Sequence, residues 1–224
     1  MQHRTLSGRP IVNMKYLRPA RSIALAASLL ASAGMLAGCH TKDMVGNEGT
    51  VQGTVQVCSS CHGFDGRGSN PTFPILAGQQ QEYLVAQLTA FRAKTRADPH
   101  AHTYMWGMAA KLDDATIKGV AEFFSKQQPS PGVTDKDPAL VAAGEKIFKN
   151  GIPAENVPAC NLCHGEHAEG AGAIPRLAGQ HSEYLERQLE AFRLKTRTND
   201  IMHDNVKQMG AVEATQIAAY LASQ

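Results

Sequence analysis

The chain of 224 residues carries one five-residue pattern twice, and no other feature constrains its fold and chemistry as strongly. The copies are Cys58-Ser59-Ser60-Cys61-His62 and Cys160-Asn161-Leu162-Cys163-His164. On a helical turn, cysteines three positions apart face the same side, so both thiols can add to the vinyl groups of one porphyrin. The histidine that follows is placed to ligate the iron. We therefore predict two covalently bound haem c groups, with His62 and His164 as axial ligands.

Three other uses of paired cysteines compete with haem attachment. A thioredoxin-like pair belongs after a strand in a βαβ pattern, and no such pattern surrounds either copy. A zinc site built from both pairs would leave the adjacent histidines unexplained. A disulfide within C-x-x-C is strained at this spacing. Haem attachment accounts for the cysteines and the histidines together.

The first 38 residues differ from the rest of the chain in charge. They carry five basic and no acidic side chains, so the remainder has an excess of three acidic residues although the whole chain has a formal charge of +2. Nothing in this balance indicates nucleic-acid binding. Lys15, Arg18 and Arg21 precede an apolar stretch over 22–36, a pattern typical of an export signal. We predict a signal peptide over 1–38, with Met14 as an alternative start.

Cys39 is the fifth cysteine, and the residues before it, Leu36-Ala37-Gly38, resemble the lipobox of bacterial lipoproteins. Lipidation explains a single unpaired cysteine in an oxidising compartment. We predict a periplasmic protein anchored to a membrane through lipidated Cys39, with 39–48 as a flexible tether. An uncleaved anchor is one alternative, although about 15 apolar residues fall short of the roughly 20 that a spanning helix needs. A cleaved signal without lipid is another.

The second half of the chain repeats the first. Beyond the haem motifs, the matched segments are L-A-G-Q at 76–79 and 177–180, E-Y-L at 82–84 and 183–185, Q-L at 87–88 and 188–189, A-F-R at 90–92 and 191–193, and K-T-R at 94–96 and 195–197. Residues 127–132 are rich in proline and glycine and indicate a linker. We predict one domain over 49–127, a linker over 128–138 and a second domain over 139–224.

Apolar residues recur with the helical period in both halves, and no convincing strand-like alternation is present. The positions that predict helices are Leu84, Leu88, Phe91, Ile117, Val120 and Phe124 in the first half, and Leu185, Leu189, Phe192, Ile217, Tyr220 and Leu221 in the second. Asp113-Asp114 is a suitable cap for the last helix of the first half. A domain of this size with few aromatic residues has a thin core, which a buried porphyrin would complete.

The second axial ligand decides whether each iron has a free position. Aligning Leu112 with Met209 brings Met105 opposite Met202, each seven residues upstream. We predict Met105 and Met202 as iron ligands on a loop before the last helix of each half, and Met108 and Met209 as packing residues. A thioether raises the reduction potential. It also fills the coordination sphere, which leaves no room for oxygen or peroxide.

Histidine is the alternative ligand at these positions. The candidates are His100, His102, His167, His181 and His203. Only His203 lies near a ligand position, and none of the five has a counterpart in the other repeat. Lone histidines of this kind are more often exposed. We therefore prefer methionine to a second histidine at both irons.

A P-x-L-x-G pattern follows each haem motif, at 74–78 and 175–179. A ligating histidine normally donates its other ring N–H to a fixed acceptor. We predict the carbonyls of Pro74 and Pro175 as these acceptors, which is compatible with a simple turn. The cations of the K-T-R segments are expected at solvated helix ends, where positive charge is favourable, and contact with haem propionates or with an acidic partner is the alternative. These cations are Lys94, Arg96, Lys195 and Arg197.

Together, C-x-x-C-H, P-x-L-x-G and a methionine before a terminal helix resemble class I cytochrome c. Their duplication, with L-A-G-Q, E-Y-L, A-F-R and K-T-R in both halves, resembles the dihaem cytochrome c4 family. The resemblance implies an all-α fold of two tandem class I cytochrome c domains, each wrapped around a covalently bound haem and related by pseudo-twofold symmetry. It implies an electron carrier in the periplasm rather than an enzyme. The implied donor is a quinol-oxidising complex and the implied acceptor a terminal oxidase.

The chain departs from the family pattern in three places. It has the apparent lipobox, its 96–105 segment is four residues longer than 197–202, and Gly210-Ala211-Val212-Glu213 replaces the usual polar cap of the last helix.

Two functional alternatives stay open. One is an electron-accepting subunit of a periplasmic dehydrogenase. The other is a dihaem peroxidase or thiosulfate-oxidising enzyme, which needs an open haem position that a methionine in both domains argues against.

Overall fold

The computed structural model describes residues 50–133 and 137–224, which lie within one compact unit, His40–Gln224. The predicted signal peptide, tether and lipidated Cys39 lie outside the described residues. Within them the regular structure is helical, and the β-type pairing is limited to isolated bridges, Ile152 with Val157 and Ala171 with Ile174. The all-α prediction is confirmed. No helix in the described ranges combines the length and apolarity needed to cross a membrane.

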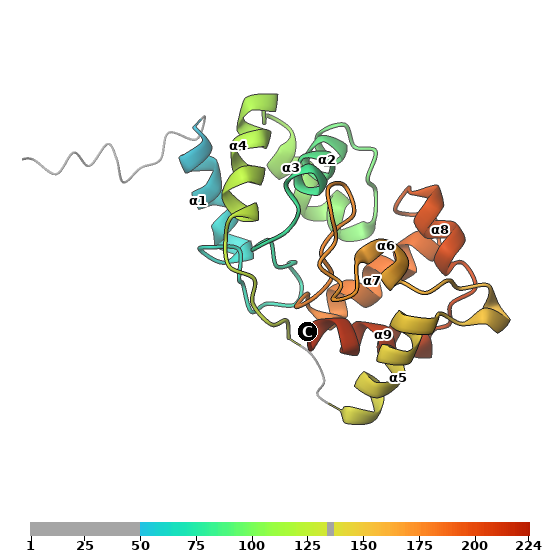
Figure 1. Ribbon diagram of the computed structural model, residues 1–224. Helices are drawn as coiled ribbons and strands as arrows, with labels where there is room; N and C mark the ends of the chain where they lie inside the picture. Colours follow the sequence, from blue (N-terminus) through green and yellow to red (C-terminus); the bar gives the residue numbers. More distant parts are fainter. Residues whose placement is uncertain (1–49, 134–136) are drawn as a thin grey trace, which may run out of the picture. The chain divides into compact units, whose positions relative to one another are not determined.

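The first half folds around two helices that pack against its last helix. Its elements are α1 (Val51–His62), α2 (Gln81–Arg92), the π-helix η2 (Ala101–Met105), α3 (Trp106–Ala109) and α4 (Asp114–Ser125). Both α1 and α2 contact α4, which Figure 1 shows beside α1. The Asp113 carboxylate accepts a 2.7 Å hydrogen bond from the N–H of Thr116, so the predicted cap of α4 is confirmed.

The second half follows the same plan with one interruption. Its elements are α5 (Pro138–Asn150), the 3₁₀-helix η3 (Pro153–Glu155), α6 (Asn161–His164), α7 (Ser182–Arg193), α8 (Asp200–Val206) and α9 (Ala211–Ala222). Both α5 and α7 contact α9. The haem motif ends a continuous helix in α1, whereas here it lies on the short α6, separated from α5. Gly210 caps α9 without a side-chain hydrogen bond, as its sequence predicts.

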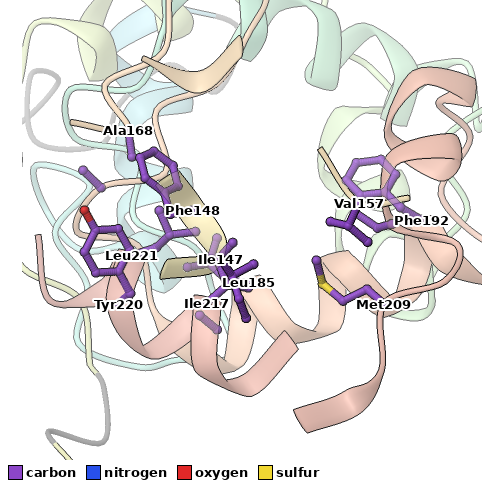
Figure 2. Close-up of a cluster of buried hydrophobic side chains, with 13 residues drawn as sticks. Ile147, Phe148, Val157, Ala168, Leu185, Phe192, Met209, Ile217, Tyr220 and Leu221 are labelled. Atoms are coloured by element: carbon purple, nitrogen blue, oxygen red, sulfur yellow. The ribbon is translucent and has the colours of Figure 1, made fainter. Parts of the chain in front are cut away.

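The predicted helical positions form the core of each half. Leu84, Leu88 and Phe91 are buried with the apolar face of α4. Of the six positions predicted for the second half, five are buried and Leu189 is partly buried. The second core is one hydrophobic cluster, and Figure 2 shows its side chains in two groups: Phe148 lies with Tyr220 and Leu221, and Val157 lies with Phe192 and Met209 across an open space. Side chains of both groups line one cavity, so the protein atoms leave room inside the core.

The two candidate methionine ligands lie on helices, not on the loops predicted from the sequence. Met105 ends the π-helix η2, and Met202 lies in the first turn of α8. The π-helix falls in the longer 96–105 segment, and its counterpart over 197–202 has none. Single turns of π-helix accommodate extra residues and are frequent at functional sites. The additional residues of the first half are therefore taken up in helical structure.

Candidate haem-binding sites

The cysteines of both haem motifs are free thiols at the edge of the core. Cys58 and Cys160 are partly buried, and Cys61 and Cys163 are exposed. Burial raises the pKa of Cys58 and of Cys160 to about 11. Redox-active C-x-x-C pairs depend on a lowered thiol pKa, whereas the pKa values of these two thiols are shifted in the opposite direction. Within the described ranges, no three His, Cys, Asp or Glu side chains gather in a metal-binding group.

Each motif histidine is buried and hydrogen-bonded to the predicted proline. The Nδ1 atom lies 2.8 Å from the Pro74 carbonyl oxygen in His62 and 3.1 Å from the Pro175 carbonyl oxygen in His164. A carbonyl can only accept, so we assign the proton to Nδ1, which leaves the Nε2 lone pair free for a metal. Burial lowers the pKa of both histidines, which favours the neutral imidazole that ligation requires.

A cavity of about 970 Å³ brings the candidate ligands together. Its wall contains His62 and Met105 from the first half and His164 and Met202 from the second, and most of the remaining lining is apolar. Cys58, Cys160 and Cys163 also line it. A hydrophobic shell with neutral imidazole nitrogens, thioethers and attachment thiols at its surface has the chemistry that haem requires. The residues present fit two haem groups.

The remaining methionines differ in their surroundings. Met209 is buried, with 5% of its surface exposed, as its predicted packing role requires, and it also lines the cavity. Met108 is 55% exposed and lies outside the cavity, so the packing role predicted for it is wrong.

His181 also differs from its prediction as an exposed residue. It is 1% exposed, accepts a 2.8 Å hydrogen bond at Nδ1 from the N–H of Val133, and donates from Nε2 to the Gly68 carbonyl at 2.9 Å. It therefore joins the second half to the linker and to the loop that follows the first haem motif. No periodic signal in the sequence distinguishes such a contact from an exposed position.

A buried hydrogen-bonded cluster joins the two halves near the ends of α2 and α7. Arg96 donates to Gln87 and Gln188, both at 2.8 Å. Arg197 donates to the same two glutamines, at 3.0 Å and 2.7 Å respectively. The prediction of solvated helix ends is confirmed for Lys94 and Lys195, which are exposed, and wrong for both arginines. The glutamines recur in both repeats, which is the sequence signal that could have identified the cluster.

The cluster is not symmetric in charge. Asp98 accepts a 2.8 Å hydrogen bond from Arg96 and is 2% exposed. Burial acts to raise the pKa of Asp98, but the charge and hydrogen bond of Arg96 hold it below its ordinary value, so this carboxylate is ionised at neutral pH. The matching residue in the second half is Asn199, whose side chain instead caps α8 by accepting from the N–H of Met202. The first half therefore carries the buried acidic residue of the interface.

Known proteins are similar to this chain in sequence and in fold. A family model described as Cytochrome c matches residues 54–128 and 141–224. Cytochrome c4 of Azotobacter vinelandii is 35% identical over 205 residues, which cover 87% of this chain and 95% of that protein. A thiosulfate dehydrogenase electron acceptor of Thiomonas intermedia (strain K12) is 34% identical over 174 residues, covering 75% and 78%. The solved cytochrome c4 of Acidithiobacillus ferrooxidans gives a TM-score of 0.72 at 39% identity, covering 75% of this chain and 99% of that one.

Proposed function

The chain belongs to the cytochrome c4 family of dihaem electron-transfer proteins, and from this premise we propose that it carries single electrons in the periplasm from a quinol-oxidising complex to a terminal oxidase. It binds two covalent haem c groups and is not an enzyme. When bound, haem supplies a reversible one-electron couple. The proposed donor and acceptor follow the family resemblance.

The observation that supports the proposal is that His62, Met105, His164 and Met202 all line one largely apolar cavity. We assign His62 and Met105 to the first iron and His164 and Met202 to the second. Cys58 and Cys61 attach the first haem, and the corresponding cysteines of α6 attach the second. The thioethers favour the reduced state and occupy the position that a substrate would need. The prolines fix the ring orientation of the histidines, and the apolar wall excludes water.

Haem stoichiometry tests the attachment residues. The purified protein is expected to contain two haems per chain, and replacing the attachment cysteines of the second domain (Cys160→Ser with Cys163→Ser) is expected to leave one, because neither vinyl group can then be captured. Pyridine haemochrome absorbance against protein concentration measures the ratio. Cys39→Ser is the matched control and keeps two haems. A double variant that retains two covalent haems would contradict the assignment.

A second candidate partner has specific support. The 34% identical relative from Thiomonas intermedia is named as an electron acceptor of thiosulfate dehydrogenase, so a periplasmic dehydrogenase is an alternative donor. Stopped-flow reduction of the oxidised protein by a purified quinol-oxidising complex and by a purified thiosulfate dehydrogenase separates the two. Fast, saturable reduction by the quinol-oxidising complex supports the proposed route. Reduction by the dehydrogenase alone would replace it with the alternative.

Membrane attachment through Cys39 has its own test. We propose that this cysteine is lipidated after cleavage of residues 1–38, which would keep the carrier close to membrane-bound partners. Several acyl chains anchor a protein stably where a single chain is marginal. Cys39→Ser is therefore expected to move the haem protein from the membrane fraction to the soluble fraction, as judged by haem staining. Retention of the variant in the membrane would support an uncleaved anchor.

A further inference from the structure

The paired L-A-G-Q segments make contacts that the haem motifs do not explain. Gln79 and Gln180 end these segments, and both are buried, with 7% and 6% of their surface exposed. Each follows a glycine with positive φ, +66° at Gly78 and +74° at Gly179, a backbone conformation that glycine adopts without strain. These turns direct each glutamine side chain to the other half of the molecule.

The side-chain amide of each glutamine accepts one hydrogen bond from, and donates another to, the backbone of a single residue in the opposite domain. Gln180 accepts from the Ile75 N–H at 2.8 Å and donates to the Ile75 carbonyl at 2.9 Å. Gln79 accepts from the Arg176 N–H at 2.8 Å and donates to the Arg176 carbonyl at 2.9 Å. Two bonds to one residue fix the orientation of its backbone as well as its position.

The residues held in this way directly follow the prolines that accept from the axial histidines. The Ile75 N–H and the Pro74 carbonyl belong to one planar peptide unit, and the same holds for Arg176 and Pro175. A bond that fixes the N–H therefore also fixes the carbonyl to which the histidine donates. In addition, a peptide whose N–H donates a hydrogen bond becomes a stronger acceptor at its carbonyl, because bonds in a chain polarise one another.

We propose that Gln180 is the positioning residue for His62 and that Gln79 is the positioning residue for His164, so that each domain orients the axial histidine of the other. The inference rests on the ligands assigned under the proposed function. A histidine that donates a strong Nδ1–H bond is a more basic ligand and stabilises the oxidised iron. Each glutamine thus holds down the reduction potential of the haem in the opposite domain and couples the two sites across the interface.

The test uses the full haem-loaded protein and compares Gln180→Leu with Gln79→Leu. Gln180→Leu is expected to raise the reduction potential of the first-domain haem and to speed hydrogen exchange of the His62 Nδ1 proton, measured by NMR on the reduced protein. The second-domain haem keeps its potential. Gln79→Leu is expected to give the mirror result at His164. Gln180→Glu keeps an acceptor for the Ile75 N–H, whose hydrogen bond polarises the Pro74 carbonyl, and it adds a negative charge, so it is expected not to raise the first-domain potential. A rise would contradict the inference, and this variant serves if the leucine variant does not fold.

Matched controls distinguish a role in orienting the axial histidines from a role in holding the two domains together. Gln80 donates to the Glu169 carbonyl at 2.9 Å, and Arg187 donates to the Pro71 and Thr72 carbonyls at 2.8 Å and 3.1 Å. Gln80→Leu and Arg187→Lys remove or weaken hydrogen bonds between the halves without changing the charge, and they do not touch the peptides next to the acceptor prolines. Both controls are expected to leave the two potentials and both Nδ1–H exchange rates unchanged.

The outcomes distinguish this inference from the assignment on which it rests. A shift confined to the domain that carries the substituted glutamine, an equal shift in both domains, or no shift would overturn the inference. In these cases the wild-type protein still shows His/Met ligation at both irons. A wild-type protein without that ligation would overturn the proposed function instead, whatever the glutamine variants do.

Discussion

Met202→Ala is expected to remove about half of the methionine-to-iron charge-transfer absorbance of the oxidised protein, since one thioether of two is lost. Met202 lies in the first turn of α8 and lines the cavity together with His164. Alanine cannot reach the iron, so the second centre gains a free position and its reduction potential falls. Carbon monoxide is then expected to bind the reduced variant rapidly. Met105→Ala is expected to do the same at the first centre, and the double variant to remove the band.

Met108→Ala is the matched control for these substitutions. Met108 follows Met105 by less than one helical turn, yet it is exposed and lies outside the cavity. The control is therefore expected to keep the full absorbance and to exclude carbon monoxide. An unchanged band in Met202→Ala, or a loss of absorbance in Met108→Ala, would show that the ligand has been assigned to the wrong side chain.

Phe148→Ala is expected to lower the free energy of unfolding of the second domain by about 3–5 kcal/mol. Phe148 is 0% exposed and packs against Tyr220 with ring centroids 5.4 Å apart. Phe148 lies in α5 and Tyr220 in α9, so the substitution leaves a cavity in the interface where these two helices pack together. Guanidinium titration of the haem-loaded protein, followed by far-UV circular dichroism and haem absorbance, measures the loss.

Phe64→Ala provides the control for the same residue type in solvent. Phe64 is 83% exposed, and exposed substitutions generally change stability by no more than about 0.5 kcal/mol. Multidomain proteins need not unfold in a single two-state transition, so the transition assigned to the second domain is fitted by itself. A cost below about 1 kcal/mol for Phe148→Ala would mean that α5 and α9 do not form the core described above.

Helices and haem motifs were predictable because they depend on local spacing. The i, i+4, i+7 series at Leu84, Leu88 and Phe91 identifies a buried helix face without knowledge of its partner. Asp113 directly precedes the helix that it caps, and each proline carbonyl lies only 11 or 12 residues beyond its histidine, within the same half of the chain. Short-range physics determines each of these features.

Contacts between the domains were not predictable in the same way. Arg96, Arg197 and His181 carry side chains that usually remain in water, and nothing in their local sequence shows that a second domain covers them. The π-helix at Met105 depends on how four additional residues are accommodated, which length alone does not specify. The burial of Gln79 and Gln180 likewise depends on a neighbour about 100 residues away.

The most direct test of the account is near-infrared magnetic circular dichroism of the oxidised, purified protein, because this spectrum distinguishes methionine from histidine as the second axial ligand. The assigned residues predict two low-spin His/Met centres per chain, with no high-spin signal. A high-spin or bis-histidine centre at either iron would contradict the central claim that the protein itself supplies a nitrogen and a sulfur ligand to both metals.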